Sequence, residues 1–162
     1  MPTNAKNRLD DIDRHLLRLL QKDALLSAEQ LGATVGLSAT AAKRRVNRMR
    51  ETGVILRDVA VVDPRQVGLE VFTLVQVNLE RDRPDILQSF QQSIRQDPRI
   101  VQGFYATGDA DFLLLVASRS LEDYERFTRE LFWENNNIRS FKTMVVMNQV
   151  KVGFELPIEN GN

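Results

Sequence analysis

The sequence has no cysteine and only one histidine among its 162 residues. The missing cysteine excludes a disulfide framework and any thiolate metal site. The single histidine, His15, falls on the polar flank of an expected helix, where we expect it to be solvated rather than catalytic. The sequence also shows no Ser-His-Asp set, no cluster of metal ligands and no glycine-rich phosphate loop. We therefore expect no enzyme activity, no cofactor and no bound metal.

Long hydrophobic runs are lacking as well. The longest run, Phe112 to Ala117, has the length of a strand, whereas a membrane-spanning helix needs roughly 20 apolar residues. The N-terminal stretch MPTNAKNRLDDIDRHLL contains no apolar signal core. We expect a cytoplasmic, nucleoid-associated protein without a membrane partner.

The charges balance over the whole chain but not along it. Residues 1–62 hold 11 Lys and Arg against 7 Asp and Glu, whereas residues 63–162 hold 11 against 15. A basic first part joined to an acidic second part indicates two units with different partners. We place a first domain at residues 1–62, a linker at 63–70 and a second domain at 71–162.

The first part has the pattern of a helix-turn-helix domain. Apolar residues at helical spacing predict a helix over residues 9–22. Ser27 is a suitable N-cap for a second helix that Gly36 ends, and Ser38 for a third helix that Gly53 ends. Two helices joined by a tight glycine-containing turn, with a third to cover them, form a helix-turn-helix. Residues 54–62 are rich in valine, which favours a short hairpin or an extended wing.

The second part alternates strand and helix patterns in the order βαββαβ, which is typical of a ferredoxin-like fold. The overall class is therefore α+β. The expected strands are residues 71–79, 100–106, 111–118 and 141–152, the expected helices are 84–97 and 121–134, and 107–110 is a hairpin turn.

The third expected helix concentrates positive charge. The stretch LSATAAKRRVNRMR has five basic residues in eight positions and no acid. A solvated helix face is the plain alternative, but such faces usually mix both signs. Duplex DNA would supply the missing anions, and the second helix of such a pair enters the major groove. The expected DNA-binding residues are Ser38, Thr40, Ala41, Lys43, Arg44, Arg45, Asn47 and Arg48, with Arg44, Asn47 and Ala41 at bases and Lys43, Arg45 and Arg48 at phosphates.

Several motifs together resemble the Lrp/AsnC (leucine-responsive/asparagine-regulatory, or feast/famine) family of transcriptional regulators. They are LDDIDRHLLRLLQKDA, SAEQLGATVGLSATAAKRRVNRMRETGVI, TGDADFLLLV, SLEDYERFTRELF and FKTMVVMNQVK, in that order. The chain departs from the family at Ala39 and Ala41, where proline is common, and at Arg50, where an acid is common. These departures concern the DNA sequence preference. The resemblance implies a ferredoxin-like effector domain, dimers that often assemble into octamers, and amino acids as effectors.

The resemblance also implies that the glycine-aspartate turn lies at an effector site between subunits. On spacing alone this turn is an ordinary hairpin. Asp109 or Asp111 could pair with an ammonium, and backbone N–H groups near Gly108 could bind a carboxylate. The other expected effector contacts are Thr107 and Thr143 through their hydroxyls and Tyr105 and Phe112 through their rings.

The alternating apolar residues of 71–79 and 141–152 indicate a sheet that is apolar on both faces. Two helices can cover only one face, so we expect a two-fold dimer that buries the other. Such a dimer presents two recognition helices and suits a palindromic double-stranded DNA operator. We expect a sequence-specific transcriptional regulator with an amino-acid effector. The alternatives are a nucleoid-organising protein without an effector and a small-molecule enzyme with a basic accessory domain.

Overall fold

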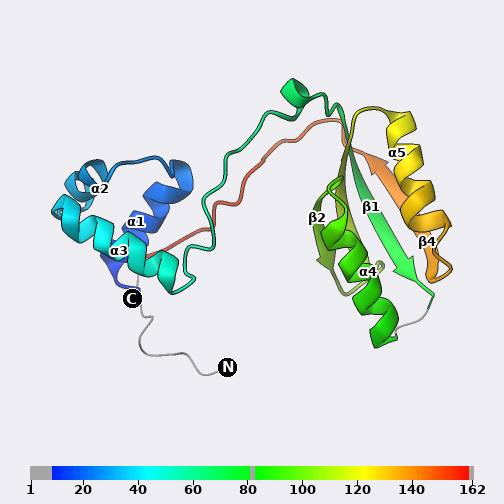
Figure 1. Ribbon diagram of the computed structural model, residues 1–162, viewed down its shortest axis with the longest axis horizontal. Coiled ribbons are helices and arrows are strands. Elements are labelled where there is room, and N and C mark those ends of the chain that lie inside the picture. Colours follow the sequence, from blue (N-terminus) through cyan, green and yellow to red (C-terminus); the bar gives the residue numbers. More distant parts are fainter. Residues whose placement is uncertain (1–8, 81–82, 161–162) are drawn as a thin grey trace. The chain divides into compact units, whose positions relative to one another are not determined.

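The computed structural model describes residues 9–80 and 83–160. Its described residues form two compact units, one of residues 9–61 with 151–160 and the other of residues 62–80 with 83–150 (Figure 1). The sequence-based division had assigned residues 151–162 to the second domain, and the structure instead places them with the first. Residues 63–70, expected as a linker, fall within the second unit, where Pro64–Val67 form the short 3₁₀ helix η2.

The first unit contains the three helices that the sequence predicted. They are α1 (Asp11–Lys22), α2 (Ala28–Val35) and α3 (Ala39–Glu51). The side chains of Ser27 and Ser38 accept N–H bonds at the starts of α2 and α3. Gly36 ends α2 with a φ of 74°, a left-handed conformation that favours glycine. Residues 54–62 contain no strand, so the hairpin alternative for them was wrong, and they run as an extended segment.

A compact apolar core holds the three helices together. The backbone of α2 lies very close to the turn that follows it, since a Cβ on Gly32 would lie 2.6 Å from the carbonyl oxygen of Leu37. Only glycine allows the two backbones to come so near. The buried residues of this core are Leu16, Leu17, Leu31, Ala42, Val46 and Met49.

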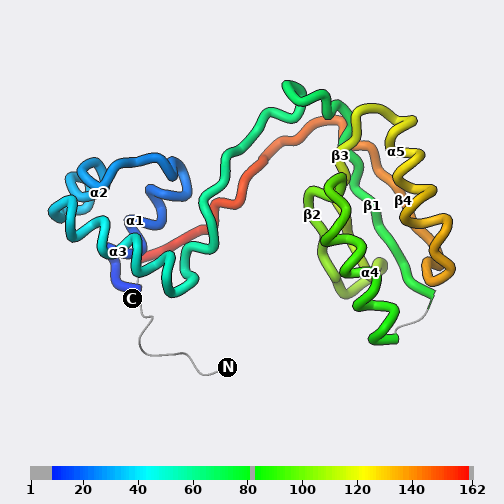
Figure 2. The backbone as a smooth tube through the Cα atoms, viewed as in Figure 1, coloured from blue at the N-terminus to red at the C-terminus, as the bar shows by residue number. Residues whose placement is uncertain are grey.

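The C-terminal segment packs against α1, a contact that no local sequence pattern indicates. The side-chain amide of Gln21 donates to the carbonyl oxygen of Leu156 at 3.2 Å and accepts from the Leu156 N–H at 2.6 Å. Arg18 donates to the carbonyl oxygen of Ile158, whose side chain packs on the core. Figure 2 shows this red end of the chain returning to the three helices. Residues 151–160 are therefore part of the helical unit.

The second unit is a four-stranded antiparallel sheet with two helices, as the sequence predicted. The strand order is β2-β3-β1-β4 and all neighbours are antiparallel. The elements are β1 (Val71–Leu79), α4 (Pro84–Gln96), β2 (Ile100–Tyr105), β3 (Phe112–Ser118), α5 (Leu121–Thr128), the π-helix η3 (Arg129–Trp133) and β4 (Ile138–Val145). This is the ferredoxin-like βαββαβ arrangement.

The last strand differs from its prediction at both ends. It was expected over 141–152 but runs over Ile138–Val145. Its neighbour in the sheet is β1, and Val145 pairs with Thr73 near the beginning of that strand. The N–H of Val146 still bonds to the carbonyl oxygen of Phe72, after which β1 provides almost no further backbone to pair. The apolar residues beyond Val146 therefore leave the sheet.

The helices α4 and α5 cover one face of the sheet (Figure 1). Val75 and Val77 of β1 lie on this face with Phe90 of α4 and Phe127 of α5. The opposite face is apolar and open, as predicted. We define this open face by four exposed side chains that cross-strand pairing places together, Phe104 (55% exposed), Leu113 (37%), Leu74 (44%) and Met144 (40%).

Candidate nucleic-acid interface and effector site

Helix α3 is oriented by its buried stripe. Ala42, Val46 and Met49 are buried against the other helices. The exposed side chains of the remaining faces include those of Lys43 and Arg44. Because positions 40, 44 and 47 lie roughly opposite the buried stripe, Thr40, Arg44 and Asn47 point outward together. Ala41 is partly buried, and the hydroxyl of Ser38 accepts the Ala41 N–H at 3.2 Å, so Ser38 is occupied as the helix cap.

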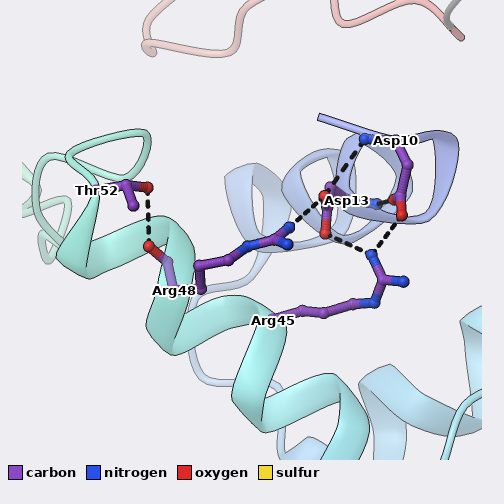
Figure 3. Close-up of polar contacts among 5 residues, drawn as sticks. All are labelled: Asp10, Asp13, Arg45, Arg48 and Thr52. Carbon is purple, nitrogen blue, oxygen red and sulfur yellow. Dashed lines mark hydrogen bonds and ion pairs between the residues drawn. The ribbon is translucent and has the colours of Figure 1, made fainter. Parts of the chain in front are cut away.

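Two of the arginines on α3 point toward α1 (Figure 3). Arg45 Nη1 donates to Asp10 Oδ2 at 2.6 Å and to Asp13 Oδ1 at 2.9 Å, and Arg48 Nη2 donates to Asp13 Oδ2. The Asp13 side chain is only 1% exposed, whereas those of Asp10 and Arg48 are 51% and 49% exposed. We refer to Asp10, Asp13, Arg45 and Arg48 as the α1–α3 ion-pair cluster.

The charges in this cluster affect one another. The N–H of Asp13 and, after it, the guanidinium of Arg45 lower the pKa of the Asp10 carboxyl. The hydrogen bonds to Asp10 and then Asp13 raise the pKa of Arg45. Asp10 and Asp13 also form a reciprocal capping box at the start of α1. The cluster therefore fixes the beginning of α1 and joins it to α3.

These pairs correct the sequence interpretation. We had argued that five basic residues without a nearby acid require an external anion, and for three of them this was wrong. Arg45 and Arg48 have partners on α1, and Arg50 donates to Asp58 at 3.0 Å. The acids lie up to 35 positions away in the sequence, so no local pattern shows them. One signal was present, because Asp13 precedes the buried Leu16 and Leu17 by three and four positions and so shares their face.

Lys43 and Arg44 differ from the three paired arginines. Within residues 9–80 and 83–160, neither has an ion pair or a side-chain hydrogen bond. Lys43 borders a groove of about 650 Å³ in the helical unit, together with Thr40 and Asn47. The predicted DNA-binding set therefore divides into exposed residues on the outer side of α3 and residues that already have intramolecular partners.

The glycine-aspartate turn joins β2 to β3. Thr107, Gly108 and Asp109 are exposed, and Gly108 has a φ of 125°, which side chains rarely allow. In the part of the chain that the structure describes, the carboxylate of Asp109 has no hydrogen bond or ion pair. The turn therefore offers a free carboxylate beside a glycine backbone.

The remaining predicted effector residues have roles within the fold. Asp111 Oδ2 accepts the N–H of Leu79 at 2.7 Å and so ties the end of β1 to the turn. Phe112 is 2% exposed and packs edge-on against Phe90 with ring centroids 5.0 Å apart. The exposed Tyr105 covers Phe112 at 5.2 Å.

Thr143 lies away from the turn in the isolated chain. It belongs to the edge strand β4, and β1 and β3 separate it from β2. Its hydroxyl is hydrogen-bonded to the hydroxyl of Tyr124, and burial raises the pKa of that tyrosine. The structure therefore groups Tyr105, Thr107, Gly108, Asp109, Asp111 and Phe112 around one hairpin but does not bring Thr143 to them.

Clusters of metal ligands and membrane-spanning helices are both missing from the described residues. No group of three or more His, Cys, Asp or Glu among them is placed to hold a metal ion. None of the helices in residues 9–80 and 83–160 combines the length and apolar character needed to cross a bilayer.

Comparisons with known proteins agree along nearly the whole chain. Residues 9–50 match the AsnC-type helix-turn-helix domain, and residues 73–156 match the Lrp/AsnC ligand binding domain. An uncharacterized HTH-type transcriptional regulator of Sinorhizobium fredii, y4tD, is 50% identical over 151 residues, which cover 93% of this chain and 89% of that protein.

Solved structures give the same result. The crystal structure of an AsnC family transcriptional regulator from Agrobacterium tumefaciens is 34% identical and superposes with a TM-score of 0.87, covering 92% of this chain and 97% of its own. A transcriptional regulator of Neisseria meningitidis, solved as a complex with L-Met, has the same fold at 24% identity, with a TM-score of 0.87 and coverage of 93% and 97%.

Proposed function

The chain belongs to the Lrp/AsnC family of transcriptional regulators, and from this premise we propose that it recognises specific operator sequences through α3 and responds to an amino acid. The coarser statement, a transcriptional regulator with a helix-turn-helix domain and a ligand-binding domain, follows from the family matches. The observation that carries the finer proposal is the outward, unpaired side of α3.

The proposed DNA contacts are narrower than the basic composition of α3. Arg44 and Asn47 reach base edges, where guanidinium and amide groups can pair with guanine and adenine. Lys43 contacts a phosphate and sets the position of the helix in the groove. Arg45 and Arg48 hold α3 against α1 and contribute less than their charge suggests, because carboxylates already occupy part of their N–H groups.

Lys43→Ala tests the phosphate contact. It should weaken binding to all duplexes about equally and reduce the salt slope by roughly 1. Unchanged binding at every salt concentration would remove Lys43 from the interface. Equal wild-type affinity for operator and random DNA would instead support a nucleoid-organising protein.

The effector proposal rests on the hairpin turn. A regulator of the same fold was solved with L-Met, and an amino acid carries an ammonium that Asp109 can pair with and a carboxylate that N–H groups near Gly108 can bind. A thermal-shift screen of the twenty amino acids, with and without DNA, tests this. Asp109→Ala should abolish the response and spare operator binding, whereas loss of both would indicate a structural role for Asp109.

The open face of the sheet supports a homodimer. A contiguous apolar patch of this kind usually marks an interface, and a two-fold copy would bury it against itself. The dimer would present two α3 helices to half-sites about 34–36 Å apart or a multiple of that distance. We propose a homodimer, in the cytoplasm at the nucleoid. Leu74→Asp should lower the mass measured by light scattering, and an unchanged mass would place the interface elsewhere.

A further inference from the structure

The ion-pair cluster contains one carboxylate that solvent can reach. Both oxygens of Asp13 are occupied, Oδ1 by Arg45 and Oδ2 by Arg48 and the Asp10 N–H, and the side chain is 1% exposed. Asp10 is different, because its side chain is 51% exposed while Oδ2 accepts from Arg45 Nη1 at 2.6 Å. Both carboxylates therefore accept from the same nitrogen of Arg45, Nη1, the buried Asp13 at 2.9 Å and the half-exposed Asp10 at 2.6 Å.

A DNA phosphate would make the same kind of bond to Arg45 that Asp10 makes. Carboxylate and phosphate oxygens both accept charge-assisted hydrogen bonds from a guanidinium. The two anions therefore compete for the N–H groups of Arg45. Lys43 and Arg44, which have no ion pair within the described ranges, face no such competition.

We propose that Asp10 withholds Nη1 of Arg45 from the DNA backbone, so that α3 binds duplex DNA of any sequence less tightly than its basic residues alone would allow. The inference rests on the proposed DNA binding of α3. Phosphate contacts carry no base information and add to affinity for every duplex. A released Arg45 would therefore raise the affinity for operator and for random DNA by about the same factor.

Asp10→Asn is the suitable variant because it leaves the helix cap in place. Asp10 Oδ1 accepts the Asp13 N–H at 2.8 Å, and asparagine caps helices about as well as aspartate. In this variant an amide NH₂ takes the place of Oδ2. Both this NH₂ and the Arg45 guanidinium are hydrogen-bond donors, so the bond between residues 10 and 45 is lost. Asp10→Ser is a second variant. Serine is also a good N-cap, but it has one side-chain oxygen, so none is left to accept from Arg45 once the cap is formed.

Each released Arg45 that reaches a phosphate should steepen the slope of log K against log salt by about 0.9. For two subunits on one duplex the slope steepens by about 1.8, which makes the loss of affinity between 50 and 200 mM salt about 12-fold greater than for the wild type. The ratio of operator affinity to random-DNA affinity should stay about the same, because a new phosphate contact strengthens both complexes. A purely structural role for Asp10 would lower affinity without steepening the slope.

Two controls distinguish a steeper salt slope caused by release of Arg45 from one caused by the change in net charge. Arg45→Gln removes the proposed target, so Asp10→Asn should have no effect on the slope in that background. Glu51→Gln removes one exposed negative charge from α3 itself, at a residue without an ion pair among residues 9–80 and 83–160, and should leave the slope unchanged.

Fluorescence anisotropy of the full-length variants on labelled operator and random duplexes measures all of these slopes. Steepening that requires Arg45 supports the proposal. An unchanged slope in Asp10→Asn, or equal steepening with and without Arg45, overturns it. A wild type that binds no duplex would refute the proposed function itself, whereas a binding wild type with an unchanged Asp10→Asn slope refutes only this inference.

Discussion

Replacing the buried carboxylate of the ion-pair cluster, in the variant Asp13→Ala, should destabilise the helical unit by about 2–3 kcal/mol. The variant loses the bonds from Arg45 and Arg48 and the return bond of the capping box. Removing one partner of a fully buried pair costs about 3–5 kcal/mol because a buried charge is left behind. Here the two arginines are 25% and 49% exposed and can be solvated by water. The cost therefore falls below that range but above that of a surface pair.

Urea unfolding followed by circular dichroism at 222 nm measures this change. With a slope of about 1 kcal/mol per molar for a unit of this size, the midpoint of the helical unit should fall by about 2–3 M. Amide hydrogen exchange read by mass spectrometry should locate the loss in α1 and α3 and leave peptides from β1 and β3 protected as before. A free-energy change below about 0.5 kcal/mol, the scatter of ordinary surface substitutions, would refute the view that Asp13 joins α1 to α3.

Three further predictions concern the turn between α2 and α3, the C-terminal segment and the dependence of stability on acid pH. Gly32→Ala should destabilise the helical unit despite a helix-propensity gain of about 1 kcal/mol. The reason is that the new Cβ would lie 2.6 Å from the Leu37 oxygen and 3.2 Å from the Ala39 nitrogen. A higher melting temperature of the variant would contradict this prediction. Deletion of residues 151–162 should lower protection of α1 from hydrogen exchange because it removes the bonds to Gln21 and Arg18; unchanged exchange would show that the segment contributes nothing. The lowered pKa of Asp10, set first by the Asp13 N–H, means that its stabilising contribution is complete above the ordinary aspartate pKa and is lost as pH falls through the lower folded value. Acid titration of the wild type and Asp10→Asn should therefore converge at low pH, and curves that stay parallel down to about pH 2 would contradict the assignment.

Local signals in the sequence were sufficient for the helices and for most of the sheet. Ser27, Gly36 and Ser38 mark helix ends through their own backbone and side-chain chemistry, so their neighbours in the sequence determine the result. The alternation in β1 likewise predicted which side chains share a face of the sheet, and the structure shows which of the two faces the helices cover.

The features that the sequence did not reveal all depend on contacts between distant residues. The end of β4 is determined by where β1 begins, and the position of residues 151–162 by α1. Within the site, the outward direction of Arg44 and Asn47 followed from helix periodicity, whereas the partners of Arg45 and Arg48 came from another helix. A charged residue in sequence shows that a partner is needed but does not identify the partner.

The most direct test of the account is the discrimination between operator and random DNA by Arg44→Ala, on an operator selected from a random-sequence pool. Loss of a bidentate base contact worth about 1–3 kcal/mol should reduce the ratio of the two affinities by about 5-fold to 150-fold, with the fold intact by circular dichroism. A ratio equal to that of the wild type would contradict the claim that the outward side of α3 recognises base sequence.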